Sequence, residues 1–345
     1  MKKKVVDIGF GRKTMYDLYK STCMSSRLQY GLVQLEDKYD IVRISWKKPT
    51  RKGTFINNFL CLTSCDVLFM YYIYPQPLVL LAILRLLGFF RRRKVIGISH
   101  VSLIHGRNFL EEIVLRCVYH TFDSILFHSP KNQLESIEKG LVSANRTDFL
   151  HWGDDLEYID QHIHCSQGGY FLSTGREQRD FSLLVSAFSK TIASLELYTN
   201  RVNFENNYEY LEEMQGKYSN IKIEFVEKSV NTTSMLAQKL ADCMCVVIPL
   251  LKNEVYYCLG LTSIIEAMAM GKPIISSRNP YSPVDIEKEQ IGFVVDDEES
   301  WIKAIEYMIS HPVETRIMGQ KARHLAECRF NIRECARQID CVFSK

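Results

Sequence analysis

Short runs of apolar residues alternate with longer stretches in which apolar and polar residues follow a helical spacing. Continuous apolar runs are typical of strands buried on both faces, and the helical spacing indicates amphipathic helices. In the first half of the chain, the runs predict strands at residues 4–8, 39–45, 66–71, 95–99 and 123–127. Helices are expected at residues 13–20, 77–90, from 108 onward and at 130–139. This alternation predicts a mostly parallel sheet with helices on both faces.

The alternation breaks near residues 151–155 and starts again at Tyr170, after a Ser-Gln-Gly-Gly sequence typical of a linker. The second half predicts strands at 170–174, 195–198, 221–226, 243–249 and 292–295, with helices at 182–194, 208–218, 233–241, 298–311 and 312–327. We therefore expect an α/β fold of two Rossmann-like, doubly wound domains facing across a cleft, at residues 1–165 and 166–330. We expect a C-terminal helix within residues 331–345 to pack back toward the first domain.

The segment at residues 256–278 predicts a loop, a helix, a tight turn and a buried strand. Gly260 gives the loop backbone freedom, and Ser263 is expected to cap a helix that begins at residue 264. Two interpretations of Glu266 stay open. In one, Ser263 and Glu266 form a capping box that closes the first turn of the helix. In the other, the carboxylate lies beside a helix N-terminus that holds a phosphate, and accepts hydrogen bonds from both ribose hydroxyls.

Two arginines follow the first strand of the second domain, in the sequence Thr-Gly-Arg-Glu-Gln-Arg. Arg176 and Arg179 come after the carboxyl end of this strand, where doubly wound domains bind their ligands. A guanidinium group can donate two hydrogen bonds to a phosphate and offset its charge. The two side chains are therefore candidates for binding a diphosphate, with a pair of solvated arginines in a loop as the alternative.

In the first domain, His100 ends an apolar strand at the edge expected to carry ligands. A histidine there can donate a hydrogen bond to a substrate, and the alternative is a buried structural residue. His105 and Arg107 are rivals for the same role, as is His128 at the end of the next strand. The glycine turn at residues 9–11 is either an anion-binding turn or a simple tight connection. It lacks the third glycine of the dinucleotide fingerprint, so the sequence does not favour a nicotinamide cofactor.

The composition is that of a folded protein of two ordinary domains, with 345 residues and a formal net charge of only +3. This charge gives no indication of nucleic-acid binding. Eleven cysteines, an odd number with no apolar leader before them, indicate reduced thiols and a cytoplasmic location. No Asp-x-Asp sequence stands where it could hold a metal–diphosphate complex, so we expect no metal.

The apolar run at residues 77–90 is shorter than the roughly 20 residues that a membrane-spanning helix needs. Four basic residues follow it at positions 91–94. A helix that covers the sheet, followed by a solvated basic turn, is one interpretation. The other is peripheral contact with anionic lipid at the inner face of a membrane.

The sequence GLTSIIEAMAMGKPIISS resembles the donor-site signature of the family 4 (group 1) glycosyltransferases, enzymes with the GT-B fold. The resemblance implies that Glu266 contacts the ribose of a nucleotide sugar. It also implies that the backbone around Gly260, Thr262 and Ser263 meets the diphosphate.

The same resemblance extends to the two arginines, because the family has Gly-Arg after this strand and a basic residue just before the next helix. Arg176 and Arg179 occupy these positions, although Asp180 replaces the glycine that usually follows. One departure concerns the donor sugar. The family often has a second glutamate eight residues before Glu266, and this chain has Cys258 there. Glu254 lies nearby as a substitute.

The resemblance implies a hexosyltransferase-type enzyme that moves a sugar from a nucleotide donor to a saccharide or lipid-linked hydroxyl acceptor, with retention and without a cofactor. Surface polysaccharide or lipid-linked glycan synthesis is the expected setting. His100 and Glu266 are the candidate catalytic residues. A nucleotide-sugar epimerase of the same fold and an inactive nucleotide-sugar-binding subunit are the alternatives, and the missing acid at Cys258 favours the second.

Overall fold

The computed structural model describes residues 2–9, 11–21, 24–45, 64–73, 75–89, 91–166, 168–175, 178–201, 208–227, 229–252 and 258–345. The chain divides into two compact units. Unit 1 contains the first strand and helix, Ser26–Trp152 and Ile332–Lys345, and unit 2 contains Gly153–Asn331. The chain therefore enters unit 2 at Gly153, earlier than the boundary expected at residue 165, and the C-terminal segment belongs to unit 1.

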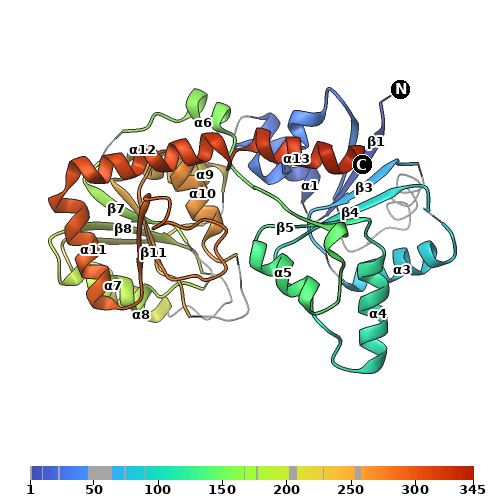
Figure 1. The fold of residues 1–345 in the computed structure, drawn as a ribbon. Helices are drawn as coiled ribbons and strands as arrows, with labels where there is room; N and C mark the ends of the chain where they lie inside the picture. The colour runs from blue at the N-terminus through green and yellow to red at the C-terminus, as the bar shows by residue number, and fades with distance from the viewer. Residues whose placement is uncertain are drawn as a thin grey trace. The chain divides into compact units, whose positions relative to one another are not determined.

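Unit 1 is built on a six-stranded parallel sheet with the order β2-β1-β3-β4-β5-β6 (Figure 1). Its strands are β1 (Lys4–Gly9), β2 (Asp40–Ser45), β3 (Val67–Met70), β4 (Lys94–Ser99), β5 (Ser124–Phe127) and β6 (Thr147–Phe149). Its α-helices are α1 (Arg12–Lys20), α3 (Pro75–Leu86), α4 (Phe109–His120), α5 (Pro130–Glu138) and α13 (Ile332–Ser344). Short 3₁₀ helices lie at Ser26–Gln29, Val33–Leu35 and Ala144–Arg146. The strand order reverses between β1 and β3, which is where a doubly wound sheet opens a crevice.

Unit 2 has a second six-stranded parallel sheet, with the order β12-β11-β10-β7-β8-β9. Its strands are β7 (Tyr170–Ser173), β8 (Ser194–Thr199), β9 (Ile221–Phe225), β10 (Cys245–Ile248), β11 (Ile274–Ser277) and β12 (Gly292–Val295). Its helices are α6 (Leu156–His162), α7 (Phe181–Ser189), α8 (Tyr208–Met214), α9 (Val230–Asp242), α10 (Leu261–Ala269), α11 (Glu298–Ser310) and α12 (Pro312–Cys328). The strand order reverses between β7 and β10, which is the topology that opens a crevice at the carboxyl edge of a doubly wound sheet.

Each sheet is buried between helices, as continuous apolar strands require. In unit 2 the core combines Phe171, Phe188 and the fully buried Trp301. In unit 1 the strand residues Val6, Leu68 and Phe127 meet side chains from α3 and α4. The expected α/β class and doubly wound sheets are confirmed.

The predicted helix at 182–194 is wrong at its end, because α7 stops at Ser189. The Asn220 side-chain amide lies 3.0 Å from the carbonyl oxygen of Phe188, 3.1 Å from that of Thr191 and 2.9 Å from that of Ala193. These contacts hold residues 188–193 in a turn that leads directly into β8. A long-range contact of this kind cannot be read from local helical spacing.

None of the helices in the described ranges is both long and apolar enough to cross a bilayer.

Candidate functional site

The point where the strand order of unit 2 reverses lies between β7 and β10, whose chains leave the sheet toward α7 and α10. Backbone hydrogen bonds tie the two exits together beyond the sheet. The Asp180 amide donates to the Pro249 carbonyl oxygen (2.9 Å), and the Leu251 amide donates to the Gln178 carbonyl oxygen (3.1 Å). The loops after both strands are thereby held at one edge.

The N-terminus of α10 opens at this edge. Gly260 is its N-cap in a left-handed conformation with φ of 78°, and a Cβ at this position would lie 3.1 Å from Cγ2 of Ile248. The first-turn amides have no intrahelical carbonyl to donate to, which makes such a terminus suitable for an anion. Thr262 in this turn is exposed. The site therefore joins a strand end of the sheet to a glycine-capped helix.

The expected role of Ser263 as a cap is wrong. Because α10 begins at Leu261, Ser263 lies inside its first turn and is buried, and no side chain caps the helix. Glu266 is partly buried and lies in the second turn of α10. This position is too far from the N-cap for its side chain to close a capping box. Of the two interpretations of Glu266, the capping box is excluded.

Arg179 is not a solvated loop residue, since only 8% of it is exposed. Its guanidinium packs directly over Gly175, where an added Cβ would lie 2.1 Å from Nε. The close approach explains why glycine stands at this position. Asp180, which departs from the family pattern, caps α7 by accepting a hydrogen bond from the Leu183 amide (3.0 Å). Arg176 lies outside the described residues.

Two hydroxyl groups at the same edge were missed by the sequence analysis. Ser173 ends β7 and Thr199 ends β8, and both residues are buried. Neither side-chain oxygen has a hydrogen-bond partner within the described ranges. Buried polar atoms are normally paired, so two unpaired hydroxyl groups at the carboxyl edge of the sheet call for an explanation. A hydroxyl residue at the last position of each of two neighbouring strands is the signal that could have identified them.

In unit 1, His100 follows β4 and its Nε2 lies 3.0 Å from the Tyr71 carbonyl oxygen. Burial lowers the pKa of His100 below its usual value, so the ring is neutral near pH 7. A neutral ring that donates from Nε2 to a carbonyl keeps Nδ1 as an acceptor. This tautomer suits acceptance of a substrate hydroxyl, in contrast to the hydrogen-bond donation expected from the sequence.

The two other candidate histidines of unit 1, His128 and His105, contact different groups. His128 is 1% exposed and its ring lies against those of Tyr30 and Trp152, at centroid distances of 5.6 and 5.4 Å. His105 Nδ1 pairs with the Glu112 carboxylate in the loop before α4. Both ring nitrogens of His128 are buried and have no hydrogen-bond partner among the described residues.

The glycine turn after β1 is a close-packed connection. A Cβ on Gly9 would fall within 2.1 Å of the Tyr71 ring, and Gly11 serves as the left-handed N-cap of α1. Beside the turn, Arg12 is buried and donates from Nε to both carboxylate oxygens of Asp7, at 3.0 and 2.8 Å. Packing accounts for the glycine at position 9.

The chain has two pairs of adjacent aspartates, at positions 154–155 and 296–297, and they have local structural roles. Asp155 caps α6, and Asp297 forms a capping box with Ser300 at the start of α11. Asp296 is paired with Arg278 at 2.9 Å. Within the described ranges, no group of three or more His, Cys, Asp or Glu side chains could hold a metal ion.

Residues 170–311 match the family model described as glycosyl transferases group 1. The matched range contains Arg176, Arg179, Gly260 and Glu266. A comparison with curated protein sequences finds no match.

Several solved structures share the fold over the whole chain. HepE of Anabaena, crystallised in complex with UDP, is 14% identical with a TM-score of 0.67, and all of both chains is covered. The lipopolysaccharide outer core galactosyltransferase WaaB in its apo form is 16% identical with a TM-score of 0.60, and 99% of each chain is covered. A putative UDP-N-acetylglucosamine 2-epimerase of Listeria monocytogenes is 12% identical with a TM-score of 0.58, covering 100% of this chain and 96% of its own. The two units have the GT-B glycosyltransferase fold.

Proposed function

We propose that this protein is a glycosyltransferase that moves a sugar from a nucleoside diphosphate sugar to a hydroxyl acceptor. The observation that carries the proposal is the glycine-capped N-terminus of α10 at the carboxyl edge between β7 and β10, where the buried Arg179 is bridged to Leu250 and Gly260 packs against the same leucine. The family match of residues 170–311 includes both elements. The complex of HepE with UDP makes UDP the first nucleotide to test.

The residues at this edge supply the hydrogen-bond donors and positive charge that a departing nucleoside diphosphate needs. The amides of Gly260, Thr262 and Ser263 and the guanidinium groups of Arg176 and Arg179 would stabilise the charge that develops on the diphosphate. A fixed set of such donors does this without a metal, so we expect transfer to proceed in EDTA.

Glu266 would orient the donor by accepting hydrogen bonds from the ribose hydroxyls. The unpaired oxygens of Ser173 and Thr199 would gain their missing partners from the bound nucleotide. Nδ1 of His100 would accept a hydroxyl of the donor sugar and so position it. Retention of the anomeric configuration and a hexose as the transferred group belong to the same proposal.

We further propose a saccharide or lipid-linked acceptor, as in the synthesis of a surface polysaccharide or a lipid-linked glycan. WaaB supports this setting, because its description names a galactosyltransferase of the lipopolysaccharide outer core. A lipid-linked acceptor would require contact with a membrane from its surface. No cofactor beyond the nucleotide sugar is needed.

Two alternatives have specific support. The likeness to a putative UDP-N-acetylglucosamine 2-epimerase favours an epimerase. Cys258 favours an inactive binding subunit, because burial raises the pKa of its thiol to about 12 and the neutral group cannot replace a carboxylate.

Release of nucleoside diphosphate from UDP-glucose, UDP-galactose and UDP-N-acetylglucosamine separates these possibilities. A glycosyltransferase releases UDP faster when saccharide or lipid-linked acceptors are added, and EDTA leaves the rate unchanged. An epimerase forms the epimeric donor without an acceptor. Binding of a donor with neither outcome would contradict transfer and leave the binding subunit. His100→Ala should lower acceptor-dependent release, whereas His324→Ala, on an exposed face of α12, should not.

A further inference from the structure

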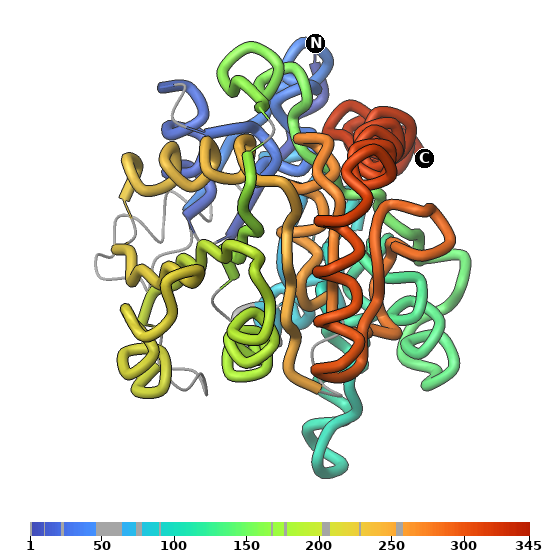
Figure 2. Tube along the Cα trace, turned by 90° about the vertical axis from the view of Figure 1, so that its left-hand side faces the viewer, coloured from blue at the N-terminus to red at the C-terminus, as the bar shows by residue number. Residues whose placement is uncertain are grey.

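A pocket of about 410 Å³ lies at the amino edge of the sheet of unit 1, where α3 and α4 end and β5 begins (Figure 1). The teal loop that leads into α4 forms the lower end of the view in Figure 2, and the pocket lies at the other end of this helix. The neighbouring β4 is six residues long, so about 20 Å of strand separates this edge from His100. The volume is typical of a small-molecule site, and the pocket is separate from the carboxyl edge described above.

Positive charge exceeds negative charge around this pocket. Three arginines reach it from separate elements: Arg85 from α3, Arg91 from the turn after α3, and Arg146 from the 3₁₀ helix before β6. Asp123 is the one acidic residue among the described residues that line the pocket. Three cations and one carboxylate leave an excess of two positive charges here, whereas the formal net charge of the whole chain is only +3.

The carboxylate of Asp123 is already engaged with one of the arginines. Nη1 of Arg85 donates to Oδ2 of Asp123 (2.9 Å), and Nη2 donates to Oδ1 (3.1 Å). The Val95 amide also donates to Oδ2, at 2.7 Å. Neither Arg91 nor Arg146 has an ion-pair partner in the part of the chain that the structure describes. The excess charge of the pocket therefore belongs to these two arginines.

Arg146 is held at the pocket by the end of α4. Its Nη2 donates to the His120 carbonyl oxygen (3.0 Å), and its Nη1 lies 3.3 Å from Nδ1 of the same histidine. Because a guanidinium group has about five N–H donors, others remain for a ligand. Burial lowers the pKa of Arg146 from its ordinary value; Asp123 opposes this shift and Arg85 adds to it. An anion bound beside Arg146 would stabilise its charged form.

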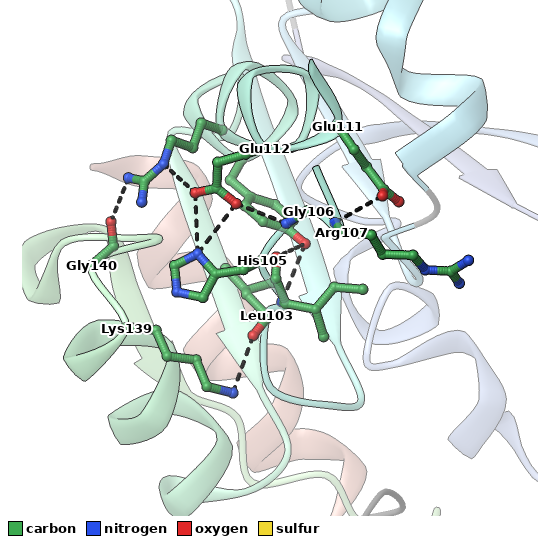
Figure 3. Close-up of polar contacts among 11 residues, drawn as sticks. Leu103, His105, Gly106, Arg107, Glu111, Glu112, Lys139 and Gly140 are labelled. Carbon is green, nitrogen blue, oxygen red and sulfur yellow. Dashed lines mark hydrogen bonds and ion pairs between the residues drawn. The ribbon is translucent and has the colours of Figure 1, made fainter. Parts of the chain in front are cut away.

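Another arginine of α4 shows the difference that a carboxylate makes. Arg116 donates from Nε to Glu112, one helical turn before it, and from Nη1 to the Gly140 carbonyl oxygen at 3.2 Å (Figure 3). Its charge is therefore balanced within the chain. Arg91 is exposed, and its guanidinium lies over Gly88, where an added Cβ would be 3.6 Å from Nε. Among the described residues, no carboxylate balances the charge of Arg91 in this way.

Two unbalanced guanidinium groups at one pocket suit a phosphate group, because each can donate two hydrogen bonds to phosphate oxygens. The pocket is larger than a phosphate group alone, and Ala82 and Leu86 add apolar surface to it. We propose that this pocket binds a phosphorylated small molecule, with its phosphate on Arg91 and Arg146 and the rest of the molecule against Leu86. This binding does not depend on the nucleotide site of unit 2 or on transfer activity.

Calorimetric titration of the full chain with glucose 6-phosphate, inorganic phosphate and glucose, without nucleotide, tests this proposal. Glucose 6-phosphate should bind, inorganic phosphate should bind more weakly, and neutral glucose should not bind. High salt should weaken the binding of both anions. R91Q and R146Q should each lower the affinity for glucose 6-phosphate about tenfold, because hydrogen bonds to a charged group are lost. R146K keeps the charge but loses the planar fork, so its affinity should fall between those of R146Q and the wild type.

The matched control is R116Q, which removes one positive charge from α4 away from the pocket and should bind glucose 6-phosphate like the wild type. Thermal unfolding of each variant checks that it is folded. R91Q changes an exposed side chain and decides the outcome if R146Q does not fold. The proposal is overturned if neither phosphate compound binds to the wild type. It is also overturned if R91Q binds glucose 6-phosphate as tightly as R116Q does, since the anion would then bind elsewhere on the chain.

Discussion

The carboxyl edges of the two sheets have the same topology but different contents. Around the edge of unit 1, aromatic rings fill the space: Tyr30 lies 6.0 Å from Tyr71 and 5.5 Å from Trp152, measured between ring centroids. Around the edge of unit 2, the strands lead into small and hydroxyl residues such as Ser173 and Gly260. A doubly wound sheet therefore offers a crevice but does not determine its use. In unit 1 aromatic packing occupies much of this edge, whereas in unit 2 backbone amides and hydroxyl groups lie there.

The largest expected effect is on the packed edge of unit 1. Arg12→Met leaves the fully buried Asp7 carboxyl without its cation, and we expect a loss of about 3–5 kcal/mol in the free energy of unfolding. Urea unfolding measures this change. Adding Asp7→Leu should restore most of the stability, because the buried charge is then gone.

An exposed ion pair serves as the control for the loss of stability expected from breaking the buried pair. Lys303 and Glu299 form an exposed ion pair one helical turn apart on α11. Lys303→Met should change the stability by less than about 0.5 kcal/mol. Equal effects of Arg12→Met and Lys303→Met would show that the edge of unit 1 is not held by its buried pair.

The second effect concerns nucleotide binding at the carboxyl edge of the sheet of unit 2. Gly260→Ala places a Cβ against Ile248 in a left-handed residue and should shift the first turn of α10. We expect nucleoside diphosphate to bind about tenfold more weakly, because hydrogen bonds to a charged group are lost. Gly216→Ala is the control, since its φ of 72° carries the same backbone strain but nothing lies within 4 Å. Both variants should lose about 1 kcal/mol of stability, and only Gly260→Ala should lose affinity.

The sequence predicted the sheets well because strands buried on both faces leave continuous apolar runs. It located the α10 segment as well, but misplaced the helix start by three residues, because Ser263 has the right chemistry for a cap and Gly260 the right backbone. It missed Ser173 and Thr199, whose importance depends on strand register and burial. The short β6 and α6 were missed too, since few residues leave little periodicity.

The third effect concerns the pH dependence of stability. Burial lowers the pKa of His128 well below its usual value, with the neighbouring His100 adding to the shift. The unfolded chain therefore binds protons below about pH 6.5 that the folded chain does not, and stability falls as the pH decreases from there. His128→Phe keeps a ring in the stack with Tyr30 and should make the slope shallower, by up to about 1.4 kcal/mol per pH unit.

Unfolding curves between pH 7 and pH 5 measure this slope. The exposed His324 provides the control, and His324→Gln should leave the slope as it is in the wild type. A slope unaffected by His128→Phe would mean that this ring takes up its proton in the folded state.

The central claim is that unit 2 binds a nucleoside diphosphate at the N-terminus of α10. Calorimetric titration of the full chain with UDP, GDP and ADP in EDTA tests it most directly. We predict that one of them binds, and that Glu266→Gln weakens its binding about tenfold because the ribose loses a charged acceptor. Glu306→Gln, on the exposed face of α11, should bind like the wild type. Equal binding by Glu266→Gln and the wild type, or no binding of any of the three nucleotides, would contradict the account.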